Sequence, residues 1–566
     1  MLPLAVSFPP EDLGRTRALL DAIAAHAPGG TVVGPYRHYR ENLDTVNRDL
    51  NTTFPVSLAL VVAMLWSLLG SLRGGIALHA PAALGLLGSA AAAAAWSLAT
   101  GRPIPLMVLG FAAALLGVAV DYGTHTTCAM GHGGVAVVRR PLITSYLTTA
   151  AAFAVLLTST VPGLRLLALL VIAGLGTALI AALTLLPRIL PALPQRNPWQ
   201  GLSRRLLGHD EPRWPRLLAA GVLTIALAPG LLRLSTEGDL RRFDGSAPGT
   251  WEQLAGFLQR WGGLDTSNAL VVDAASADGA LAAHAAARRA LAAPAPLIEA
   301  LVPDAHEQEA RRTAWNAAVV DLSERFAAAC RTAGLRPAGF DLAAYAPVAA
   351  ARPPVTAADW NGTPLAALLA TQLRALPGGG WRVATPIART DVDPPAPAWI
   401  AARTRIGAGL VRAVRGDLAT RLPLIAAAIL LLVLAVERSL RAAAAVLLPT
   451  VLALAWTFGL LGWLGQPLTP FSLLAAAFMG GIGIDSALFL ASGQGPRAVP
   501  PVLVASLTTI AGVATLVFAH HPLIRSIGIS LTIGMTLCLI ACLLITPPLR
   551  RRTAGQEHDN ESPATP

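Results

Sequence analysis

Long apolar runs alternate with short polar segments along most of the chain, and this pattern predicts a membrane protein. About eleven runs reach or approach the roughly 18–20 residues that an α-helix needs to cross a bilayer. They fall near residues 54–72, 76–99, 104–128, 142–160, 164–186, 216–234, 421–436, 442–464, 468–491, 499–518 and 523–546. The fold class that we expect is a mainly α-helical membrane protein.

A polar insert, residues 236–415, separates the two groups of apolar runs and is rich in Ala, Pro, Arg and Asp. Strand-like and helix-like patterns alternate in it, which favours an α+β domain. The expected strands lie at 269–272 and 381–383, and the expected helices at 278–292, 316–333 and 399–418. Asp304, His306 and Glu307 lie close together there, where a helix start is a better interpretation than a metal site.

The first fifty residues resemble the end of a similar domain. Residues 3–8 and 31–36 have strand-like patterns, whereas residues 11–26 and 37–50 have helix-like ones. The run at 216–234 precedes the insert, so its counterpart in a duplicated chain would precede residue 1. We therefore expect the first transmembrane helix and most of a first periplasmic domain to be missing.

Composition agrees with the membrane interpretation. The chain has 566 residues, of which 54% are hydrophobic and 13% charged, with a net charge of +11 and a mean hydropathy of +0.58. The arginines cluster at the ends of apolar runs, so the charge indicates topology rather than nucleic-acid binding. With the loop after the first run in the cytoplasm, Arg139, Arg140 and residues 550–552 also lie there. We expect a multi-pass protein of the cell inner membrane with a cytoplasmic C-terminus.

This topology predicts a division into seven parts. They are a remnant of a first periplasmic domain (1–50), a first bundle of five helices (51–190), a cytoplasmic linker (191–215), a transmembrane helix (216–235), a periplasmic α+β domain (236–415), a second bundle of five helices (416–549) and a cytoplasmic polar tail (550–566). The four cysteines have no disulfide or metal-ligand spacing. With no recognisable catalytic motif either, we expect no enzyme, no metal and no cofactor.

The two groups of apolar runs repeat one another. Matching residues are separated by nearly constant offsets: 368 for Pro55 and Pro423, 364 for Asp121 and Asp485, and 360 for Pro162 and Pro522. Both repeats have the same predicted orientation. Parallel repeats of this kind place functional sites near their interface.

Asp121 and Asp485 are the most informative residues, because each lies within an apolar run. A carboxylate at membrane depth costs roughly 2.5–3.5 kcal/mol even on the more permissive insertion scale. Burial favours its neutral form, so a change of protonation can bias the packing of two helices. The matched positions of Asp121 and Asp485 in the two repeats therefore indicate a relay for protons or for other ions.

Neighbouring polar residues are candidates for support of that relay. His125 lies one turn after Asp121 and could relay protons, or could lie at a cytoplasmic helix end. The hydroxyl groups could satisfy the aspartates or could bond their own backbone. They belong to Thr148, Thr149, Thr508 and Thr509. Close helix packing is the expected role of the glycines Gly117, Gly481 and Gly483. His520 and His521 fall in a short loop, where a surface pair is a better interpretation than a pH sensor or metal site.

The phrase from Gly117 to Tyr122, its copy around Asp485 and the large insert resemble the resistance–nodulation–division transporters, and most closely their MMPL-type lipid exporters. The resemblance covers roughly residues 30–550. It implies a proton relay through Asp121, Tyr122 and Asp485 and periplasmic domains that carry substrate. Ser486 replaces the second tyrosine of the family motif, so a symmetric pair of Asp–Tyr bridges is not expected.

The resemblance implies a proton-driven exporter of lipid-like or other amphipathic molecules, working by proton antiport. Its partners would be the bilayer, the substrate and protons, with no nucleic acid. A homo-oligomer or a periplasmic accessory protein is also compatible with the family. Two alternatives remain open: a membrane sensor or assembly factor similar to sterol-sensing proteins, and a subunit of a secretion motor.

Overall fold

In the computed structural model the chain divides into two compact units. Unit 1 comprises residues 1–39 and 247–406, and unit 2 comprises residues 40–246 and 407–566. The structure describes, apart from a few isolated positions, residues 12–69, 72–101, 112–130, 134–190, 214–235, 240–261, 268–336, 353–387, 391–492 and 498–549. Residues 191–213 of the expected linker (191–215), the tail at 550–566 and most of the run at 3–8 lie outside these residues.

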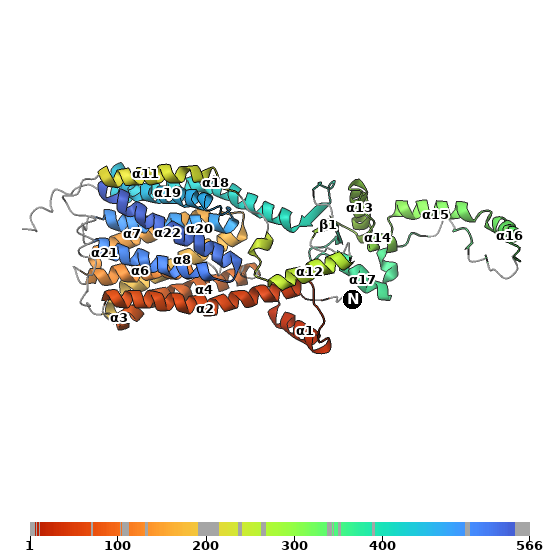
Figure 1. The fold of residues 1–566 in the computed structure, drawn as a ribbon, viewed down its shortest axis with the longest axis horizontal. Helices are drawn as coiled ribbons and strands as arrows, with labels where there is room; N and C mark the ends of the chain where they lie inside the picture. The colour runs from red at the N-terminus through yellow and green to blue at the C-terminus, as the bar shows by residue number, and fades with distance from the viewer. Residues whose placement is uncertain are drawn as a thin grey trace, which may run out of the picture. The chain divides into compact units, whose positions relative to one another are not determined.

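Unit 2 is a bundle of long helices that run side by side (Figure 1). The helices of its first half are α2 (Pro35–Leu69), α3 (Leu72–Ala77), α4 (Ala80–Thr100), α6 (Ala112–Met130), α7 (Val135–Leu156), α8 (Pro162–Thr184) and α9 (Leu186–Ile189). Then come α11 (Trp214–Leu231) and the 3-10 turn η1 (Leu240–Phe243). The second half contains α18 (Arg403–Glu437), α19 (Leu440–Trp463), α20 (Pro470–Ala491), α21 (Val499–Ala514), η5 (Thr515–Phe518) and α22 (Pro522–Leu549).

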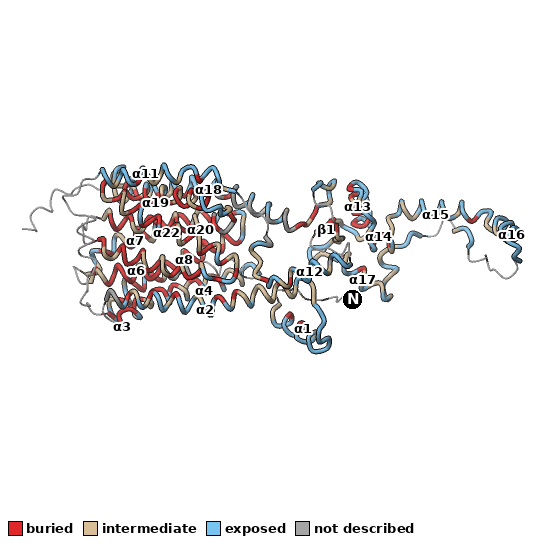
Figure 2. The backbone as a smooth tube through the Cα atoms, in the orientation of Figure 1, coloured by how far each residue is buried: buried red, intermediate tan, exposed pale blue. Residues whose placement is uncertain are grey.

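Each of the predicted apolar runs coincides with a helix of unit 2. Eight helices among the described residues are long and apolar enough to cross a membrane. The other three runs correspond to α6, α7 and α20. The outer face of α11 shows why the bundle needs a lipid environment: its side chains Trp214, Leu218, Val222 and Ile225 are 57–75% exposed (Figure 2). An apolar face of this size is typical of contact with acyl chains.

The repeat is visible in how the helices pack. In the first half α4 and α6 pack against α8, and in the second half α19 and α20 pack against α22. The two halves meet where α6 packs against α21 and α7 packs against α20. The third helix of each half therefore contacts the fourth helix of the other half. The fold class predicted from the sequence is confirmed.

Unit 1 contains a small antiparallel sheet with the strand order β2-β3-β1-β4. The strands are β1 (Asn268–Ala274), β2 (Leu373–Ala375), β3 (Trp381–Pro386) and β4 (Trp399–Ala402). Its helices are α1 (Leu13–His26), α12 (Pro248–Trp261), α13 (Ala277–Ala290), α14 (Leu297–Leu301), α15 (Ala305–Val319), α16 (Leu322–Thr332), η3 (Ala357–Trp360) and α17 (Pro364–Gln372). Helix α13 covers the sheet and buries Ala280 and Leu281 against Val383 of β3. This is the α+β arrangement that the sequence predicts.

Three local predictions for unit 1 are wrong. Residues 31–33 form no strand, because two glycines precede them and no described strand pairs with them. The expected helix at 316–333 is interrupted between Val319 and Leu322, where Asp321 takes the N-cap position of α16. The expected helix at 399–418 begins as a strand, because Ile400 pairs with Leu270 in the sheet.

The predicted helix start at Asp304 is confirmed. Its carboxylate accepts the backbone N–H of Glu307 at 2.8 Å and a hydrogen bond from Arg289 at 2.7 Å. A side chain that accepts the orphan N–H groups of a first turn is a standard N-cap. The residues around Asp304 therefore begin α15, as the sequence indicates.

Candidate functional site

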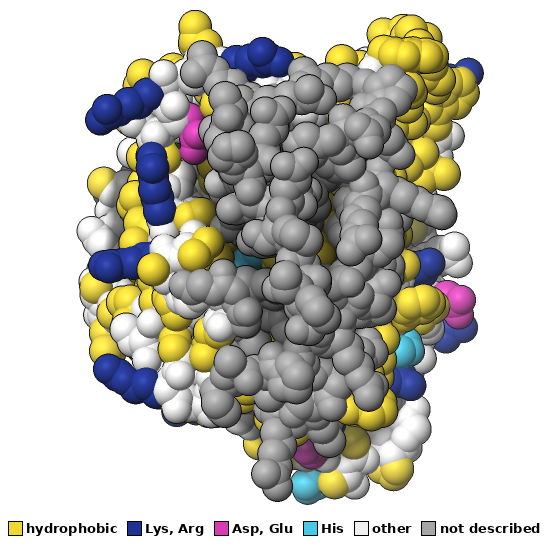
Figure 3. Space-filling view, turned by 90° about the vertical axis from the view of Figure 1, so that its left-hand side faces the viewer, with side chains coloured by type: hydrophobic (Ala, Val, Ile, Leu, Met, Phe, Trp, Pro, Cys, Tyr) yellow, Lys and Arg dark blue, Asp and Glu magenta, His cyan; other side chains and the backbone are white. Residues whose placement is uncertain are grey.

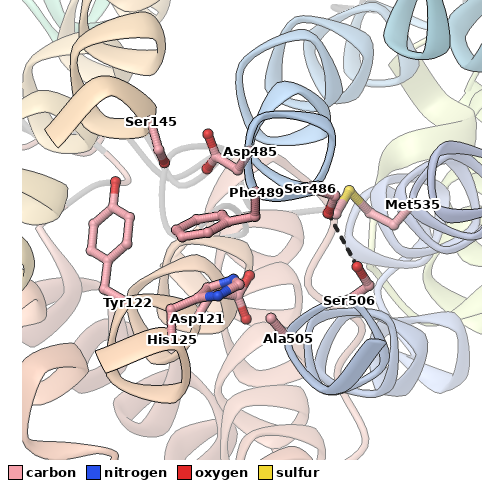
Figure 4. Close-up of a pocket in the computed structure, with 10 residues that line it drawn as sticks. All are labelled: Asp121, Tyr122, His125, Ser145, Asp485, Ser486, Phe489, Ala505, Ser506 and Met535. Carbon is pink, nitrogen blue, oxygen red and sulfur yellow. Dashed lines mark hydrogen bonds between the residues drawn. The ribbon is translucent and has the colours of Figure 1, made fainter. Parts of the chain in front are cut away.

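The third helix of each repeat brings its acidic motif to one small cavity in the bundle. Helix α6 contributes Asp121, Tyr122 and His125, and α20 contributes the corresponding positions of the second repeat. The cavity measures about 10 Å³, close to the lower limit for one water molecule. It is lined by Asp121, Tyr122, His125, Ser145, Asp485, Ser486, Phe489, Ala505, Ser506 and Met535 (Figure 4).

Asp121 is held by a hydroxyl group from the other repeat. Thr509 Oγ1 on α21 lies 3.1 Å from Asp121 Oδ1 and 3.0 Å from Oδ2, so it donates to the carboxyl group. The matching threonine, Thr149 on α7, crosses the interface in the opposite direction and donates to the carbonyl oxygen of Gly481 at 3.2 Å. Each repeat thus supplies one threonine hydroxyl to the motif helix of the other.

The other two candidate threonines bond within their own helices. Thr148 donates to the carbonyl oxygen of Ser145 at 2.8 Å. Thr508 donates to the carbonyl oxygens of Val504 and Ala505 at 2.9 and 2.8 Å. Such bonds satisfy a buried hydroxyl without linking helices. Of the two interpretations left open by the sequence, the packing role therefore applies to Thr148 and Thr508.

Asp485 has a different environment from Asp121. Its Oδ1 is buried without a hydrogen-bond partner, and the same holds for the Tyr122 hydroxyl and the Ser145 hydroxyl. In Figure 4 the Ser145 hydroxyl lies between the Tyr122 phenol and the Asp485 carboxyl group. Three unsatisfied polar atoms around one cavity are costly unless a water molecule or a small rearrangement satisfies them. This cluster is the polar centre of the site.

Ser486, which stands in place of the second tyrosine, bonds elsewhere. Its Oγ lies 3.2 Å from Ser506 Oγ on α21 (Figure 4). The Ser486 side chain therefore links α20 to α21. Thr509 donates to Asp121, whereas Asp485 Oδ1 has no hydrogen-bond partner, so the two carboxyl groups have different surroundings.

His125 lies inside the bundle and not at a helix end facing the surface. Its side chain is only 5% exposed. The ring stacks on Phe489 with 3.6 Å between ring centroids and 5° between the ring planes. Phe489 occupies the same position in the second repeat, because the two residues are separated by the 364-residue offset of the aspartates. The two rings therefore meet at the interface of the repeats.

Two of the candidate glycines lie at close helix contacts. A Cβ atom on Gly481 would lie 3.3 Å from both Phe153 and Thr149 on α7. A Cβ atom on Gly483 would lie 2.6 Å from the sulfur of Cys538 on α22. Gly483 therefore allows α20 and α22 to approach each other. Gly117 lies in α6, but its surroundings are outside the described residues.

Charge in the cavity is entirely acidic apart from His125. Among the described residues that line it, none is an arginine or a lysine. The described part of the chain also contains no group of three or more His, Cys, Asp or Glu residues able to hold a metal ion. Two buried carboxyl groups without a basic partner are costly to keep charged together. This arrangement suits the gain and loss of protons.

Sequence reasoning missed five residues that line the cavity: Ser145, Phe489, Ala505, Ser506 and Met535. The repeat offsets could have found Phe489, because it matches His125. The same offsets could not have found Ser145, since its counterpart at the 360-residue offset is Ala505. Its importance comes from its orientation toward Asp485 in the folded bundle.

Comparisons with known proteins support the fold. Neither a family model nor a curated protein matches the chain. The chain is similar to the crystal structure of a heavy metal efflux pump in two crystal forms. Form II has 13% identity, a TM-score of 0.52, and coverage of 90% of this chain and 67% of the pump. Form I has 14% identity, a TM-score of 0.50, and coverage of 89% and 68%.

A further similar structure is that of SecDF, a translocon-associated membrane protein from Thermus thermophilus. It has 13% identity and a TM-score of 0.49, over 92% of this chain and 63% of SecDF. The chain thus spans about two thirds of the length of these proteins. The eight helices that are long and apolar enough to cross a membrane, among the described residues, make the chain a multi-pass membrane protein. Its fold is similar to that of the heavy metal efflux pump.

Proposed function

We propose that this protein is a proton-driven membrane exporter of lipid-like or other amphipathic molecules. The observation that carries the proposal is the cavity that collects Asp121 and Asp485 from matching helices of the two repeats. The carboxyl groups lie at a seam between two halves of a bundle that can repack as units. The fold that it shares with an efflux pump supports a role in transport.

The proposed relay uses the different surroundings of the two carboxyl groups. Asp485, whose Oδ1 has no hydrogen-bond partner, takes up a proton beside Tyr122 and Ser145. Loss of its charge removes the desolvation penalty that resists closer packing of α20. Moving one proton down the membrane potential supplies ~2.3 kcal/mol per 100 mV. That free energy biases the repeats between two arrangements.

Asp121 supplies the second position of the relay. It shares the cavity with Asp485 and is held by Thr509 from the opposite repeat. When the proton reaches Asp121, the hydrogen bond to α21 must adapt to the neutral acid. Protonation at this position is therefore transmitted to the second repeat through a direct contact.

We further propose that the chain is an inner-membrane protein of the MMPL-type branch. Arginine side chains support this orientation: they stand along the margin of one end of unit 2 in Figure 3, as the positive-inside rule requires of a cytoplasmic face. The arginines near helix ends include Arg139 and Arg140 in α7, Arg188 in α9 and Arg438 between α18 and α19. The α+β unit of residues 247–406 would then be periplasmic and would contact the exported molecule.

The proposal is tested by reconstitution of the whole chain into lipid vesicles. Vesicles with an imposed proton gradient are loaded with a fluorescent long-chain fatty acid, and an internal pH dye records proton movement. We expect Asp121→Asn and Asp485→Asn each to reduce both fluxes at least tenfold, equivalent to about 1.4 kcal/mol. Asp278→Asn, an exposed carboxylate in the first turn of α13, is the matched control and should leave both fluxes unchanged.

The outcome separates the relay from the cargo. Loss of the proton flux in both variants supports the relay, whereas proton flux that equals the wild type in both variants contradicts it. Proton flux without any movement of the fatty acid, in the wild-type protein, would overturn the lipid-like cargo and keep the relay.

A further inference from the structure

Two buried carboxylates occupy equivalent positions within the first helix of each repeat in unit 2. Asp49 lies on α2 and Asp417 on α18, separated by the same 368 residues as Pro55 and Pro423. Their side chains are 1% and 6% exposed. A buried carboxylate needs hydrogen-bond donors, and both find them in the opposite repeat.

Asp49 caps the N-terminus of α22. It accepts the backbone N–H of His520 at 2.9 Å and that of His521 at 2.7 Å, directly before Pro522 begins the helix. A negative charge is favourable at a helix N-terminus, where N–H groups lack partners. Because α2 belongs to the first repeat and α22 to the second, Asp49 holds the two repeats together.

Asp417 does the same for α8 of the first repeat. It accepts the backbone N–H of Thr160 at 3.0 Å, the Thr160 hydroxyl at 2.9 Å and the Ser159 hydroxyl, just before Pro162. Thr160 and His520 are 360 residues apart, the offset of Pro162 and Pro522. The two caps are therefore equivalent contacts between the repeats.

The two caps differ in the cation beside the carboxylate. Arg421, one turn after Asp417, donates to it at 2.7 Å and keeps its charge at all relevant pH values. In the other cap the partner is His520, whose Nδ1 lies 2.9 Å from Asp49 Oδ1. The His520 side chain is 53% exposed, so its imidazole is in contact with the medium.

His521 has a separate role, and its surface position predicted from the sequence is wrong. Only 2% of it is exposed. Its Nδ1 accepts the N–H of Leu523 at 3.3 Å, so Nε2 carries the hydrogen and donates to Asn42 Oδ1 at 3.1 Å. Burial lowers the pKa of His521, against the opposing effect of Asp49 and of Asp244. His521 therefore stays neutral, and the change of charge belongs to His520.

We propose that Asp49 and His520 form a proton-responsive latch between the two repeats, and that the Asp417 cap is its pH-insensitive counterpart. A hydrogen bond from an imidazolium to a carboxylate is stronger than one from a neutral imidazole. Acidification on this side of the membrane therefore tightens the contact between α2 and α22. The contact between α18 and α8 does not change. In acid the α2–α22 contact therefore becomes stronger than its counterpart in the other repeat. This inference concerns the contact between repeats and does not rest on the proposed function.

Amide hydrogen exchange of the whole chain in lipid nanodiscs tests the latch. Exchange is compared at about pH 5.5 and about pH 7.5, on either side of the usual imidazole titration, and corrected for the intrinsic rate. The reporter segments are residues 516–526 and the equivalent residues 156–166. We expect the first segment to be about three- to fivefold more protected at the lower pH, a modest change because His520 is half exposed. The second segment should show no such change.

Variants assign the effect. His520→Gln keeps a donor but cannot gain a charge, so it should abolish the pH dependence of segment 516–526. Because His520 is exposed, this variant should fold. Asp417→Asn should increase exchange in segment 156–166 at both pH values and leave the pH response of 516–526 intact. The relay variant Asp121→Asn should keep the latch, which separates this inference from the transport proposal.

Three results would overturn the latch. One is equal protection of segment 516–526 at both pH values in the wild-type protein. Another is a pH dependence that persists in His520→Gln. An equal pH response in segment 156–166 would also contradict it, because the permanent charge of Arg421 should prevent such a response.

Discussion

Replacing Thr509 with valine removes the hydroxyl that holds Asp121 and keeps nearly the same shape. The neighbouring residue provides a matched control, because Thr508 has the same side chain on the same helix and is equally buried. The Thr508 hydroxyl bonds its own helix, whereas the Thr509 hydroxyl crosses to α6. The pair of variants isolates the contact between helices.

The two variants should lose different amounts of stability. A hydrogen bond between membrane helices contributes on average about 0.6 kcal/mol and at most about 1.7. A bond to a charged group contributes about 1.5–3 kcal/mol. Since both oxygens of Asp121 lie within 3.1 Å of Thr509 Oγ1, we expect Thr509→Val to reduce the free energy of unfolding by about 1–2 kcal/mol. Thr508→Val should cost less than about 0.5 kcal/mol.

The measurement is reversible unfolding of the purified chain in mixed micelles, with a rising fraction of a denaturing detergent. A double-mutant cycle with Asp121→Asn gives the coupling free energy of the pair. We expect a coupling of about 1 kcal/mol for Thr509 and none for Thr508. Equal losses for Thr508→Val and Thr509→Val, or additive effects of Thr509→Val and Asp121→Asn, would refute the assignment of this hydroxyl to Asp121.

Three further predictions follow from the bundle. Ser145→Ala loses no hydrogen bond, so stability should change by less than about 0.5 kcal/mol while dye-recorded proton uptake into vesicles slows severalfold; unaltered uptake would exclude Ser145 from the relay. Gly483→Ala should reduce the free energy of unfolding by about 1–3 kcal/mol, because the new Cβ atom would lie 2.6 Å from the Cys538 sulfur. In the control Gly480→Ala the Cβ atom has no atom within 4 Å, so this variant should be tolerated in the same unfolding assay. Burial acts to raise the pKa of Asp417, but hydrogen bonds from Ser159 and Thr160 and the Arg421 charge hold it below its usual value. The stability that the charged Asp417 carboxylate adds to the folded protein is therefore complete above about pH 4 and is lost as the pH falls through the lowered pKa. The thermal destabilisation caused by Asp417→Asn should therefore become smaller in acid. A difference in melting temperature between wild type and variant that stays constant with pH would contradict this.

The membrane helices and the repeat could be predicted from the sequence, and the reason is physical. A helix in lipid must satisfy its own backbone and present apolar side chains over a fixed length, so hydropathy alone locates it. The offsets between Pro55 and Pro423 and between Asp121 and Asp485 then relate the two halves. Since equivalent helices pack equivalently, the placement of both acidic motifs at one seam follows from that register.

The sequence was not sufficient where the rotation of a side chain about its helix decides the contact. Thr148 and Thr149 are adjacent, yet only Thr149 faces the other repeat. Ser145 carries no signal in the sequence, and its orientation toward Asp485 depends on how α7 packs against α20. His521 lies in a loop, as the sequence predicts, but it is buried and not on the surface, because it contacts Asn42 and Asp49 of α2.

The repeats share a backbone arrangement, the two aspartates and the two crossing threonines, but other side chains at their seam differ. Tyr122 is matched by Ser486, His125 by Phe489 and Ser145 by Ala505. Two carboxyl groups in identical surroundings would bind a proton equally well, and a proton would have no preferred order of transfer between them. Here Asp121 accepts a hydrogen bond from a threonine, whereas Asp485 lies beside hydroxyl groups without hydrogen-bond partners. The state with the proton on Asp121 and the state with the proton on Asp485 therefore differ in free energy. In the proposed relay this difference determines which carboxyl group is protonated first. A duplicated bundle acquires such a sequence of steps only when the side chains of its two repeats differ at the seam.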